Sequence, residues 1–333
     1  MTLAETIALI EPLDAAAEAR ARAELDRKTK PRRSLGRLED LAARVAAIAG
    51  ESSLSAAVVV AAGDHGVAAE SVSAYPQEVT RQMLANFEGG GAAVCVLARE
   101  AGAALRVVDV GVGRPTGNIA AGPAMTRDEA ESLLEQGIGE AGALVAGGSR
   151  VLVPGEMGIG NTTVASALAA VLLPAEPEAV CGRGTGLDDA GVARKVDVVR
   201  RALAVNDVDP RDPLGVLAAL GGRELAFLSG LVLGAAAGRA VALLDGFISS
   251  TAALVAARLA PAAADSMIAA HRSPEPGHAL VLDALGLTPL LDLELRLGEG
   301  SGAALALPLL RSALAILADM ATFDSAGVTD AGR

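Results

Sequence analysis

Residues 151–163 read Val-Leu-Val-Pro-Gly-Glu-Met-Gly-Ile-Gly-Asn-Thr-Thr. A short apolar run comes first, a glycine-rich turn follows it, and a helix is expected to begin near Thr162. A strand that is apolar at successive positions is typical of a parallel sheet with both faces covered by helices. This stretch therefore predicts one strand–turn–helix unit of an α/β fold.

The same pattern recurs along the chain, with longer helical stretches between the apolar runs. Since parallel strands end at one edge of a sheet, and ligands of such sheets bind beyond that edge, the turns after the runs are predicted to line one mouth. The fold class predicted is α/β, with a doubly wound, mostly parallel sheet. The five expected strands are Ala57–Ala62, Leu105–Val110, Val151–Pro154, Ala240–Leu244 and Met267–Ala270.

The first 50 residues have a different, helical character. Residues Ala15–Asp26 are rich in Ala, Glu and Arg, which favour a helix. Lys30-Pro31 ends that helix, and Ser34 is expected to cap the next one. Apolar residues then repeat at helical spacing until Gly50, where the second helix should end.

The bulk composition excludes several classes of partner. The chain has 333 residues, which suggests one large domain with an appendage, or two domains. Its net charge of −12 argues against binding a nucleic-acid backbone. Aromatic residues make up 2% and Trp is absent, so stacking platforms for single-stranded bases are not expected either.

Other features point to a cytoplasmic protein without a membrane segment. Cys95 and Cys181 are far apart in sequence and are interpreted as buried small hydrophobic residues. The N-terminus lacks the basic-then-apolar pattern of a signal peptide. The longest uncharged stretch, Met157 to Ala175, contains polar residues near its start, so its apolar part is too short to span a bilayer.

Two isolated acids lie among glycines. Glu299 lies in the stretch Arg-Leu-Gly-Glu-Gly-Ser-Gly-Ala-Ala-Leu that covers residues 296–305, and Glu156 lies in the stretch quoted first. A lone acid in a turn usually faces solvent or caps a helix. Two acids in two glycine-rich turns favour acid/base chemistry on a small polar ligand.

Two glycine-rich segments are candidates for phosphate binding. Gly182-Arg-Gly-Thr-Gly186 does not follow the dinucleotide pattern, and Gly155–Thr163 lacks the Lys-Ser/Thr ending of a P-loop. The second segment could still present backbone N–H groups to a phosphate at the start of a helix, and an ordinary turn is the alternative. Lys195 is either a solvated lysine or a partner of that phosphate.

The histidines do not indicate a metal site. Asp64-His65 could be an acid/base pair, but no further His or Cys lies nearby in sequence and a structural turn is favoured. His271 and His278 have no metal-type spacing. No metal and no cofactor are therefore predicted. Tyr75, the only tyrosine, could face an aromatic ligand or pack as an ordinary residue.

Taken together, the motifs resemble those of the nicotinate-nucleotide–dimethylbenzimidazole phosphoribosyltransferase family. The matching segments occur in collinear order over nearly the whole chain, and the set is far more specific than any one of them. They are Lys30–Glu39, Gly63–Val67, Gly117–Met125, Gly155–Thr163, Lys195–Arg201, Leu244–Phe247 and Arg296–Leu305.

The resemblance implies a particular reaction. The phosphoribosyl group of nicotinate mononucleotide moves to a nitrogen of 5,6-dimethylbenzimidazole, nicotinate leaves, and α-ribazole 5′-phosphate forms. Glu299 is then the general base that takes the benzimidazole N–H proton. Glu156 supplies negative charge near an oxocarbenium-like transition state or holds a ribose hydroxyl.

The resemblance also implies the binding residues. The 5′-phosphate is expected at Gly158, Gly160 and Asn161, at Gly182 and Gly184, and at Lys195. Asp245 and Ser273, which follow the fourth and fifth apolar runs, are expected to contact the substrates too.

The base pocket departs from some family members. These carry Ser and Gln where this chain has Tyr75 and Met83. The two residues are expected to shape the choice of acceptor base, and the preferred base is left open.

The family fold implies a domain arrangement and a partner. Residues 1–50 are expected to form the helical N-terminal part of a small domain. Residues 51–300 form the Rossmann-like catalytic domain, and residues 301–333 complete the small domain. The family also implies a homodimer.

Two other functions are compatible with the same pocket. A non-catalytic nucleotide-binding protein would bind the substrates without releasing nicotinate, and an N-ribosyl hydrolase would use water in place of the base. The same chemistry with another lower-ligand base is a third possibility.

Overall fold

A computed structural model of the protein describes residues 1–50 and 54–329. Within this part of the chain, five strands form one sheet in the order β2-β1-β3-β4-β5, and every neighbouring pair is parallel. The five runs expected as strands are confirmed, with their ends unchanged or shifted by up to three residues. The strands are β1 (Ala56–Gly63), β2 (Ala104–Gly111), β3 (Val151–Met157), β4 (Val241–Leu244) and β5 (Met267–Ala269).

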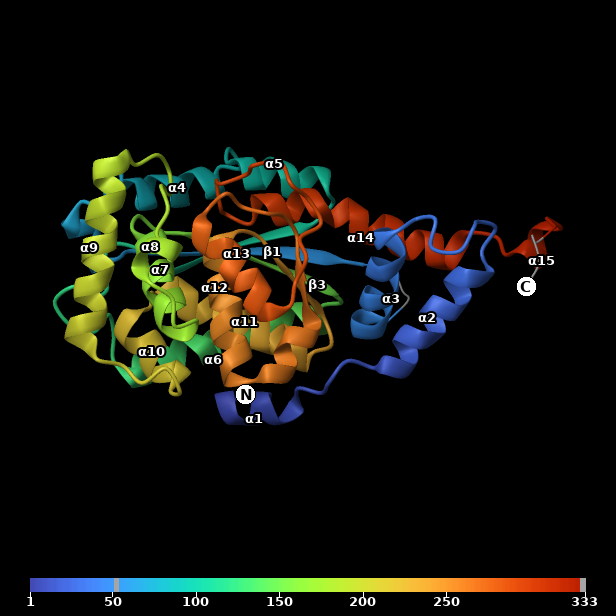
Figure 1. The fold of residues 1–333 in the computed structure, drawn as a ribbon, viewed down its shortest axis with the longest axis horizontal. Coiled ribbons are helices and arrows are strands. Elements are labelled where there is room, and N and C mark those ends of the chain that lie inside the picture. Colours follow the sequence, from blue (N-terminus) through green and yellow to red (C-terminus); the bar gives the residue numbers. More distant parts are fainter. Residues whose placement is uncertain (51–53, 330–333) are drawn as a thin grey trace.

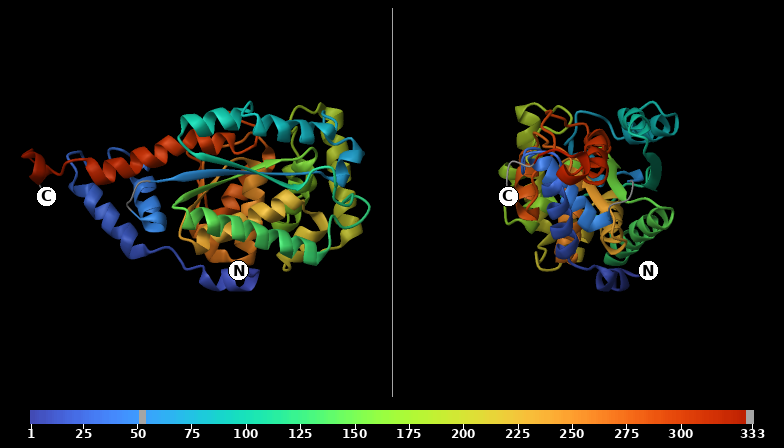
Figure 2. Two further views of the ribbon diagram at one scale, coloured as in Figure 1. Left: turned by 180° about the vertical axis from the view of Figure 1, so that it is seen from behind. Right: turned by 90° about the vertical axis from the view of Figure 1, so that its right-hand side faces the viewer.

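Helices connect the strands and cover both faces of the sheet (Figures 1 and 2). Short 3₁₀ helices occur at Gly66–Glu70 (η1) and Pro261–Ser266 (η2). The α-helices are α1 (Leu3–Leu9), α2 (Ala15–Arg27), α3 (Arg37–Ala49), α4 (Glu78–Glu88), α5 (Ala93–Glu100), α6 (Arg127–Ala146), α7 (Asn161–Leu172), α8 (Pro177–Val180), α9 (Asp189–Asn206), α10 (Pro213–Leu220), α11 (Arg223–Ala237), α12 (Phe247–Leu259), α13 (Pro276–Leu285), α14 (Ser301–Asp319) and α15 (Phe323–Ala326).

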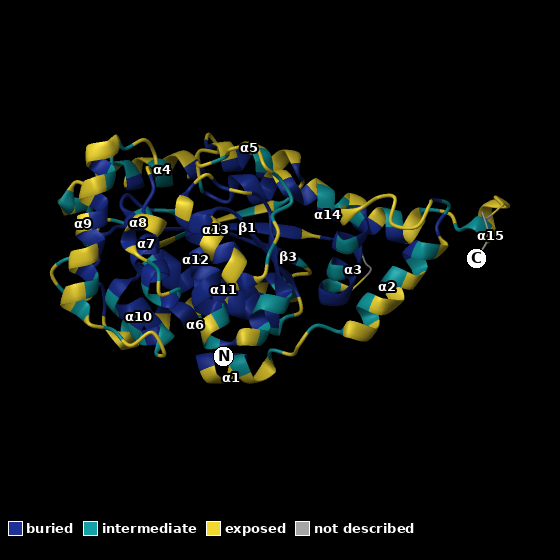
Figure 3. Ribbon diagram, viewed as in Figure 1, coloured by how far each residue is buried: buried dark blue, intermediate teal, exposed yellow. Residues whose placement is uncertain are grey.

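Alternate side chains of β1 pack into two separate hydrophobic cores, one on each face of the sheet. Ala57, Val59 and Ala61 pack with α6, α7, α11 and α12, whereas Val58 and Val60 pack with α3, α5 and α14. Successive side chains of a strand point to opposite faces, so a strand covered on both sides must be apolar throughout. The predicted doubly wound α/β class is therefore confirmed, and Figure 3 shows the strands and α11 as the most buried part.

Helices from both chain ends form an extension beside the sheet. Figure 1 shows α2, α3 and the C-terminal part of α14 projecting together from the body, with α15 at the tip. The first helix does not join them. Leu3 at its start packs in the core shared with α6 and α11, and the Leu3 N–H donates to Glu135 of α6 at 3.0 Å.

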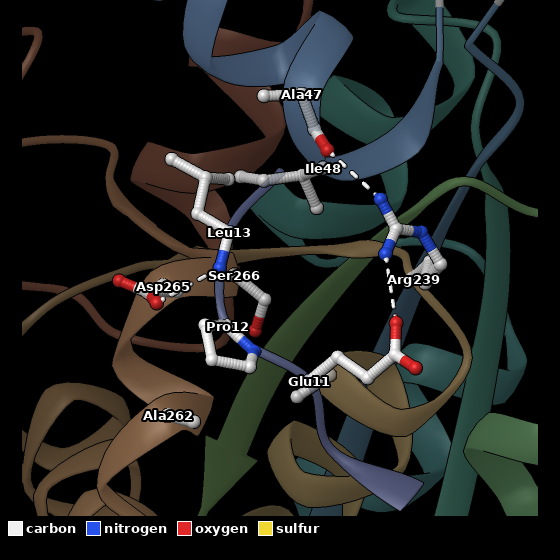
Figure 4. Close-up of a pocket in the computed structure, with 10 residues that line it drawn as sticks. Glu11, Pro12, Leu13, Ala47, Ile48, Arg239, Ala262, Asp265 and Ser266 are labelled. Carbon is white, nitrogen blue, oxygen red and sulfur yellow. Dashed lines mark hydrogen bonds and ion pairs between the residues drawn. The ribbon is translucent and has the colours of Figure 1, made fainter. Parts of the chain in front are cut away.

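The join between the body and this extension is fixed by polar contacts (Figure 4). The Arg239 guanidinium donates to the Ala47 carbonyl near the end of α3 at 3.2 Å and lies 3.5 Å from a Glu11 carboxylate oxygen. The Leu13 N–H donates to the Asp265 carboxylate at 3.0 Å. These contacts tie the segment between α1 and α2 to the body.

The helix cap expected at Ser34 is wrong. Helix α3 begins at Arg37, after Gly36, and no side chain caps it from that position. The Glu39 carboxylate instead accepts the Leu35 N–H at 3.0 Å and pairs with Lys30 at 2.8 Å, with both side chains buried. Glu39, a residue of α3, therefore fixes the segment Lys30–Gly36 through these two contacts. Helix α3 does end at Gly50, as expected.

One described helix, α14, is long and apolar enough to cross a membrane by length and composition alone. Core helices of folded domains pass the same test, and 56% of the apolar window of α14 is buried in the fold. Its Arg311 guanidinium also donates to the Leu54 carbonyl at 3.2 Å. The packing of α14 against α3, α5 and β3 accounts for its apolar composition.

The close approach of α6 and α11 depends on glycine. A Cβ at Gly137 would overlap the Phe227 carbonyl oxygen and lie 2.8 Å from the Leu231 nitrogen. Gly142 lies on the same helix with nothing within 4 Å of its Cβ position. The two glycines therefore form a matched pair of test sites, one in contact and one open.

We expect Gly137→Ala to lower the free energy of unfolding by about 1–3 kcal/mol, because the added methyl group overpacks the helix contact. Gly142→Ala should leave stability unchanged or raise it by up to about 1 kcal/mol through helix propensity. Urea unfolding of the two variants measures the difference. Equal stabilities would contradict the close-approach account.

Candidate active site

A cavity lies at the carboxyl edge of the sheet, where β3, β4 and β5 end. Residues after these three strands line it, together with part of the Gly182–Gly186 segment and the loop before α14. The expectation that all five turns line one mouth is only partly correct. The lining residues are Glu156, Met157, Gly158, Ile159, Asn161, Thr162, Gly184, Thr185, Gly246, Phe247, Ile248, His271, Ser273, Glu275, Arg296, Leu297 and Gly298.

The turns after β1 and β2 are absent from this lining for different reasons. Strand β2 is at the edge of the sheet, away from β4 and β5. His65, after β1, is fully buried behind the turn after β3, where a Cβ on Gly158 would come within 2.8 Å of its Nε2. His65 also pairs with the buried Glu224 at 2.8 Å. Asp64 accepts the Gly113 N–H at 2.7 Å, so this acid–histidine sequence is structural.

Glu156 lies at the end of β3 and not in the turn where the sequence suggested it. It pairs in register with Ala61 of β1, and its side chain is buried. One carboxylate oxygen accepts a hydrogen bond from the Asn161 side-chain amide, and the other accepts the Glu299 N–H at 3.3 Å. Burial and the nearby negative charge of Asp245 raise the pKa of Glu156 well above its usual range.

Glu299 adopts a backbone conformation that side chains other than glycine rarely adopt. Its φ is +65°, and it lies between Gly298 and Gly300, the N-cap of α14. The residue is only 5% exposed, and its buried Oε2 has no hydrogen-bond partner among the described residues. Burial, and secondarily the charge of Asp245, raises the pKa of Glu299 to about 7. Strained residues of this kind cluster at functional sites.

Glycines allow the two glutamates to approach each other. A Cβ on Gly298 would overlap a carboxylate oxygen of Glu156, and a Cβ on Gly155 would lie 2.8 Å from the Glu299 carbonyl carbon. Thus the loop before α14 crosses the end of β3 in direct backbone contact. The glycines flanking Glu299 and Glu156 in sequence have this steric role.

Lys195 lies behind the cavity wall. Its side chain is 0% exposed, and its ammonium donates to the Thr162 hydroxyl and the Gly182 carbonyl, both at 3.0 Å. Burial lowers the pKa of Lys195, and the charge of Glu275 opposes that effect. Thr162 and Gly184 line the cavity, and a Cβ on Gly184 would lie 3.5 Å from the ammonium. The two glycine-rich segments and the lysine are therefore brought together.

The turn after β3 leads directly into α7. Gly160 is the N-cap of that helix with φ +98°, and no side chain caps it. In its first turn, the N–H groups of Asn161 and Thr163 donate to the Gly158 and Gly160 carbonyls, and the Thr162 N–H, which has no partner among the described residues, can face an anion. Gly158 and Asn161 line the main cavity, whereas Gly182 lines an adjoining one that shares Gly184, Glu275 and Arg296 with it.

The structure adds Glu275 to this region, a residue that the sequence analysis missed. Its Oε1 accepts the Gly184 N–H at 2.9 Å, and its buried Oε2 has no partner among the described residues. It lies between a proline and the start of α13, where no short motif marks it. Only its spatial position beside Gly182 and Gly184 indicates a role.

Ser273 and Asp245 differ in their placement. Ser273 lines the cavity, and its N–H donates to His278 Nδ1 at 2.9 Å. Burial, with the nearby charge of His271, lowers the pKa of His278 to about 4, which keeps this nitrogen a neutral acceptor. Asp245 is buried, does not line the cavity, and uses its carboxylate for backbone N–H groups of the Glu299 loop.

Tyr75 and Met83 are not brought to this cavity. Tyr75 lies before α4 and is 51% exposed. Met83 is partly buried on α4, against the core on the α14 side of the sheet. One turn earlier on α4, the Thr80 hydroxyl accepts the Ile159 N–H at 3.1 Å, so α4 does contact the turn after β3.

The described residues contain no group of three His, Cys, Asp or Glu side chains arranged to hold a metal ion. Cys95 and Cys181 are free and buried, as expected for small hydrophobic residues. The cavity therefore presents carboxyl groups, backbone N–H groups and a buried ammonium. Such a set suits proton transfer beside an anionic ligand.

Comparison with known proteins shows close relatives over almost the whole chain. A family described as phosphoribosyltransferase matches residues 10–328. A nicotinate-nucleotide–dimethylbenzimidazole phosphoribosyltransferase from Desulforudis audaxviator is 52% identical, over 99% of this chain and 98% of the relative. The enzyme of the same name from Salinispora tropica is 50% identical, over 98% and 99%.

Solved structures are equally similar. A crystal structure of this phosphoribosyltransferase from Thermus thermophilus has a TM-score of 0.90 and 48% identity, over 96% of this chain and 100% of that chain. A crystal structure described as CobT from the same organism has a TM-score of 0.91 and 50% identity, over 94% and 99%.

The raised pKa of Glu299 makes a prediction about stability. The folded protein holds the proton of Glu299 more tightly than the unfolded chain, whose value is about 4.5. This contribution to stability is fully present below pH 4.5 and is lost as the pH rises through about 7. Charged Glu299 therefore destabilises the fold at pH 8, by roughly 1–3 kcal/mol after allowance for solvent.

We expect Glu299→Gln to be more stable than the unmodified protein at pH 8 and similar to it at pH 5. Denaturant unfolding across this range measures the difference. Glu100→Gln, at the exposed end of α5, is the control and should show no such pH dependence. A stability difference for Glu299→Gln that stays constant from pH 5 to pH 8 would contradict the burial of an ionisable carboxyl group.

Proposed function

The chain belongs to the nicotinate-nucleotide–dimethylbenzimidazole phosphoribosyltransferase family, and we infer that it carries out the reaction of that name. It moves the phosphoribosyl group of nicotinate mononucleotide to 5,6-dimethylbenzimidazole and releases nicotinate and α-ribazole 5′-phosphate. The observation that carries this conclusion is about 50% identity over nearly the full length of curated relatives of that name. The reaction serves assembly of the lower ligand of cobalamin.

We propose that Glu299 is the general base. One nitrogen of the neutral benzimidazole attacks the anomeric carbon of the ribose, and the bond to the nicotinate nitrogen breaks with its electron pair going to nicotinate. The proton on the other benzimidazole nitrogen passes to Glu299, which keeps positive charge off the product. A base is most effective when its pKa lies near the working pH, and the pKa of about 7 for Glu299 suits this role.

Glu156 is proposed to hold a ribose hydroxyl. The alternative role, a negative charge beside the transition state, needs an ionised carboxylate. The raised pKa of Glu156 favours its neutral form in the free protein. A neutral carboxyl group beside the Asn161 amide can still donate and accept hydrogen bonds.

The 5′-phosphate is proposed to bind where Thr162, Gly184 and the start of α7 meet. Lys195 supports this site from behind, because its ammonium contacts Thr162 and lies beneath Gly184. A buried positive charge next to the Thr162 N–H, which has no partner among the described residues, is favourable for a phosphate. Glu275 carries the opposite charge nearby and is proposed to hold the Gly182–Gly186 segment through its bond to Gly184.

The homodimer is a further proposal, supported by the family resemblance and by the exposed Leu293 and Leu297 on the loop before Glu299. Light scattering should then give twice the chain mass of 33.1 kDa. A mass of one chain at micromolar concentration would contradict it.

The function is tested by mixing the protein with nicotinate mononucleotide and a panel of benzimidazoles and purines, with products resolved by mass. We expect nicotinate release that depends on an added base. Glu299→Gln, which keeps the shape and removes the basicity, should lower kcat by about 10²–10⁴-fold. Near-normal turnover of this variant at neutral pH would contradict the role of Glu299.

The same assay separates the alternative functions. Formation of ribose 5-phosphate without an added base would identify a hydrolase. Binding of nicotinate mononucleotide without nicotinate release would identify a non-catalytic nucleotide-binding protein. Either result would overturn the proposed reaction.

Removing the charge of Lys195 should selectively weaken binding of the phosphorylated substrate. Lys195→Met keeps the buried stem and should weaken nicotinate mononucleotide binding about 10- to 100-fold, the cost of one charge-assisted contact. Binding of the dephosphorylated riboside should change much less. The control is Arg194→Met, since Arg194 is exposed on the same helix and donates to the Ser71 carbonyl. Calorimetry measures both ligands, and equal weakening of the two would show that Lys195 does not serve the phosphate.

A further inference from the structure

Asp245 holds the loop that carries Glu299. It follows β4, and its two carboxylate oxygens accept the N–H groups of Gly300 at 3.2 Å and Ala303 at 3.0 Å. Gly300 is the residue directly after Glu299, and Ala303 is in the first turn of α14. Both bonds are buried and join residues that are more than 50 positions apart in sequence.

These two bonds replace a missing helix cap. The N-cap of α14 is Gly300, which has no side chain to accept the free N–H groups of the first turn. Asp245 supplies the acceptor from another part of the chain. Its negative charge at a helix N-terminus is favourable as well. The start of α14, and Glu299 directly before it, are thereby fixed to the end of β4.

His271 holds Asp245 from the other side. Its Nε2 lies 3.3 Å from the Asp245 carboxylate, and both side chains are buried. Gly302, in the first turn of α14, makes room for the ring, because a Cβ there would lie 2.6 Å from Nε2. His271 also forms a β-bridge to Leu291, on the segment that leads to Glu299. Gly298, Gly300 and Gly302 thus all allow close contacts around the Glu299 loop.

We propose that Asp245, supported by His271, is a positioning residue that fixes the Glu299 loop at the cavity wall, where Gly298 lines the cavity, and so sets the place of the buried Glu299 carboxyl group for proton transfer. Asp245 does not line the cavity, whereas the sequence predicted that it contacts the substrates. The proposal rests on the function inferred above. Asp245 and His271 would act on Glu299 through the backbone of its loop.

Several ionisable groups lie near Glu299, and Asp245 is the one whose charge raises the pKa of Glu299. Glu156 accepts the Glu299 N–H from β3, Asp245 accepts the Gly300 N–H from the loop after β4, and His271, after β5, lies against Asp245. Arg296 lies on the Glu299 loop, and Glu224 of α11 acts on Glu156. Burial is the largest cause of the raised pKa of Glu299, and Asp245 is the second. Removing the charge of Asp245 should therefore lower this pKa.

The experiment measures kcat, KM for nicotinate mononucleotide, and the pH profile of kcat for the full-length protein and Asp245→Asn. An amide can accept one N–H group but not two with the same geometry. We expect kcat at pH 8 to fall about 10²-fold through misplacement of the base. KM should stay within about threefold, and the acid limb of the profile should move to lower pH.

A purely structural role would lower the folded fraction without moving the acid limb. Asp212→Asn is the matched control, because Asp212 caps α10 through the Gly215 N–H outside the cavity. It should lower thermal stability and leave the limb in place. An unchanged acid limb in folded Asp245→Asn, or a limb moved to higher pH, would overturn the proposal.

His271→Asn covers the case in which Asp245→Asn does not fold. Without the imidazole, the negative charge of Asp245 is less well compensated, so the acid limb should move to higher pH, the reverse direction. An unmoved or lowered limb in this variant would overturn the proposal. Nicotinate release by the unmodified protein tests the inferred function separately, since that result does not depend on either variant.

Discussion

The site depends on one close approach, in which the loop before α14 crosses the end of β3 with backbone against backbone. Gly155 and Gly298 permit it, because a methyl group at either position would overlap the opposing segment. The approach places the buried Glu156 carboxyl group against the backbone of Glu299, whose N–H donates to it at 3.3 Å. Burial in this environment of low polarity, with the negative charge of Asp245 nearby, raises the pKa values of both carboxyl groups.

The other ionisable groups of the site form two clusters near the two glutamates, and each cluster pairs an acid with a basic side chain. Asp245 and His271 lie behind Glu299 at the ends of β4 and β5. Lys195, Thr162 and the start of α7 lie on the other side, near Glu275. The sheet edge, where parallel strands all end, is what brings these segments together.

Much of the fold could be predicted from the sequence, because the signals were local. Each strand is an unbroken apolar run that ends in a polar or glycine-rich turn, and all five were located to within one to three residues. The two glutamates stood out because glycines surround them. The cap of α3, the burial of Lys195 and the roles of Asp245, His271 and Glu275 could not be predicted. Each depends on a partner far away in sequence, such as Gly300 for Asp245 or Gly184 for Glu275.

The central claim is that Glu299 is a buried base that changes charge near neutral pH. Direct titration of its carboxyl carbon by ¹³C NMR, in protein labelled at glutamate and assigned with Glu299→Gln, tests it. The account predicts that this carbon titrates with a pKa of about 7 in the free protein. The same value should mark the acid limb of kcat/KM, which reports the free enzyme. A Glu299 carboxyl group that titrates near its ordinary value of 4.5, while activity falls around pH 7, would contradict the account.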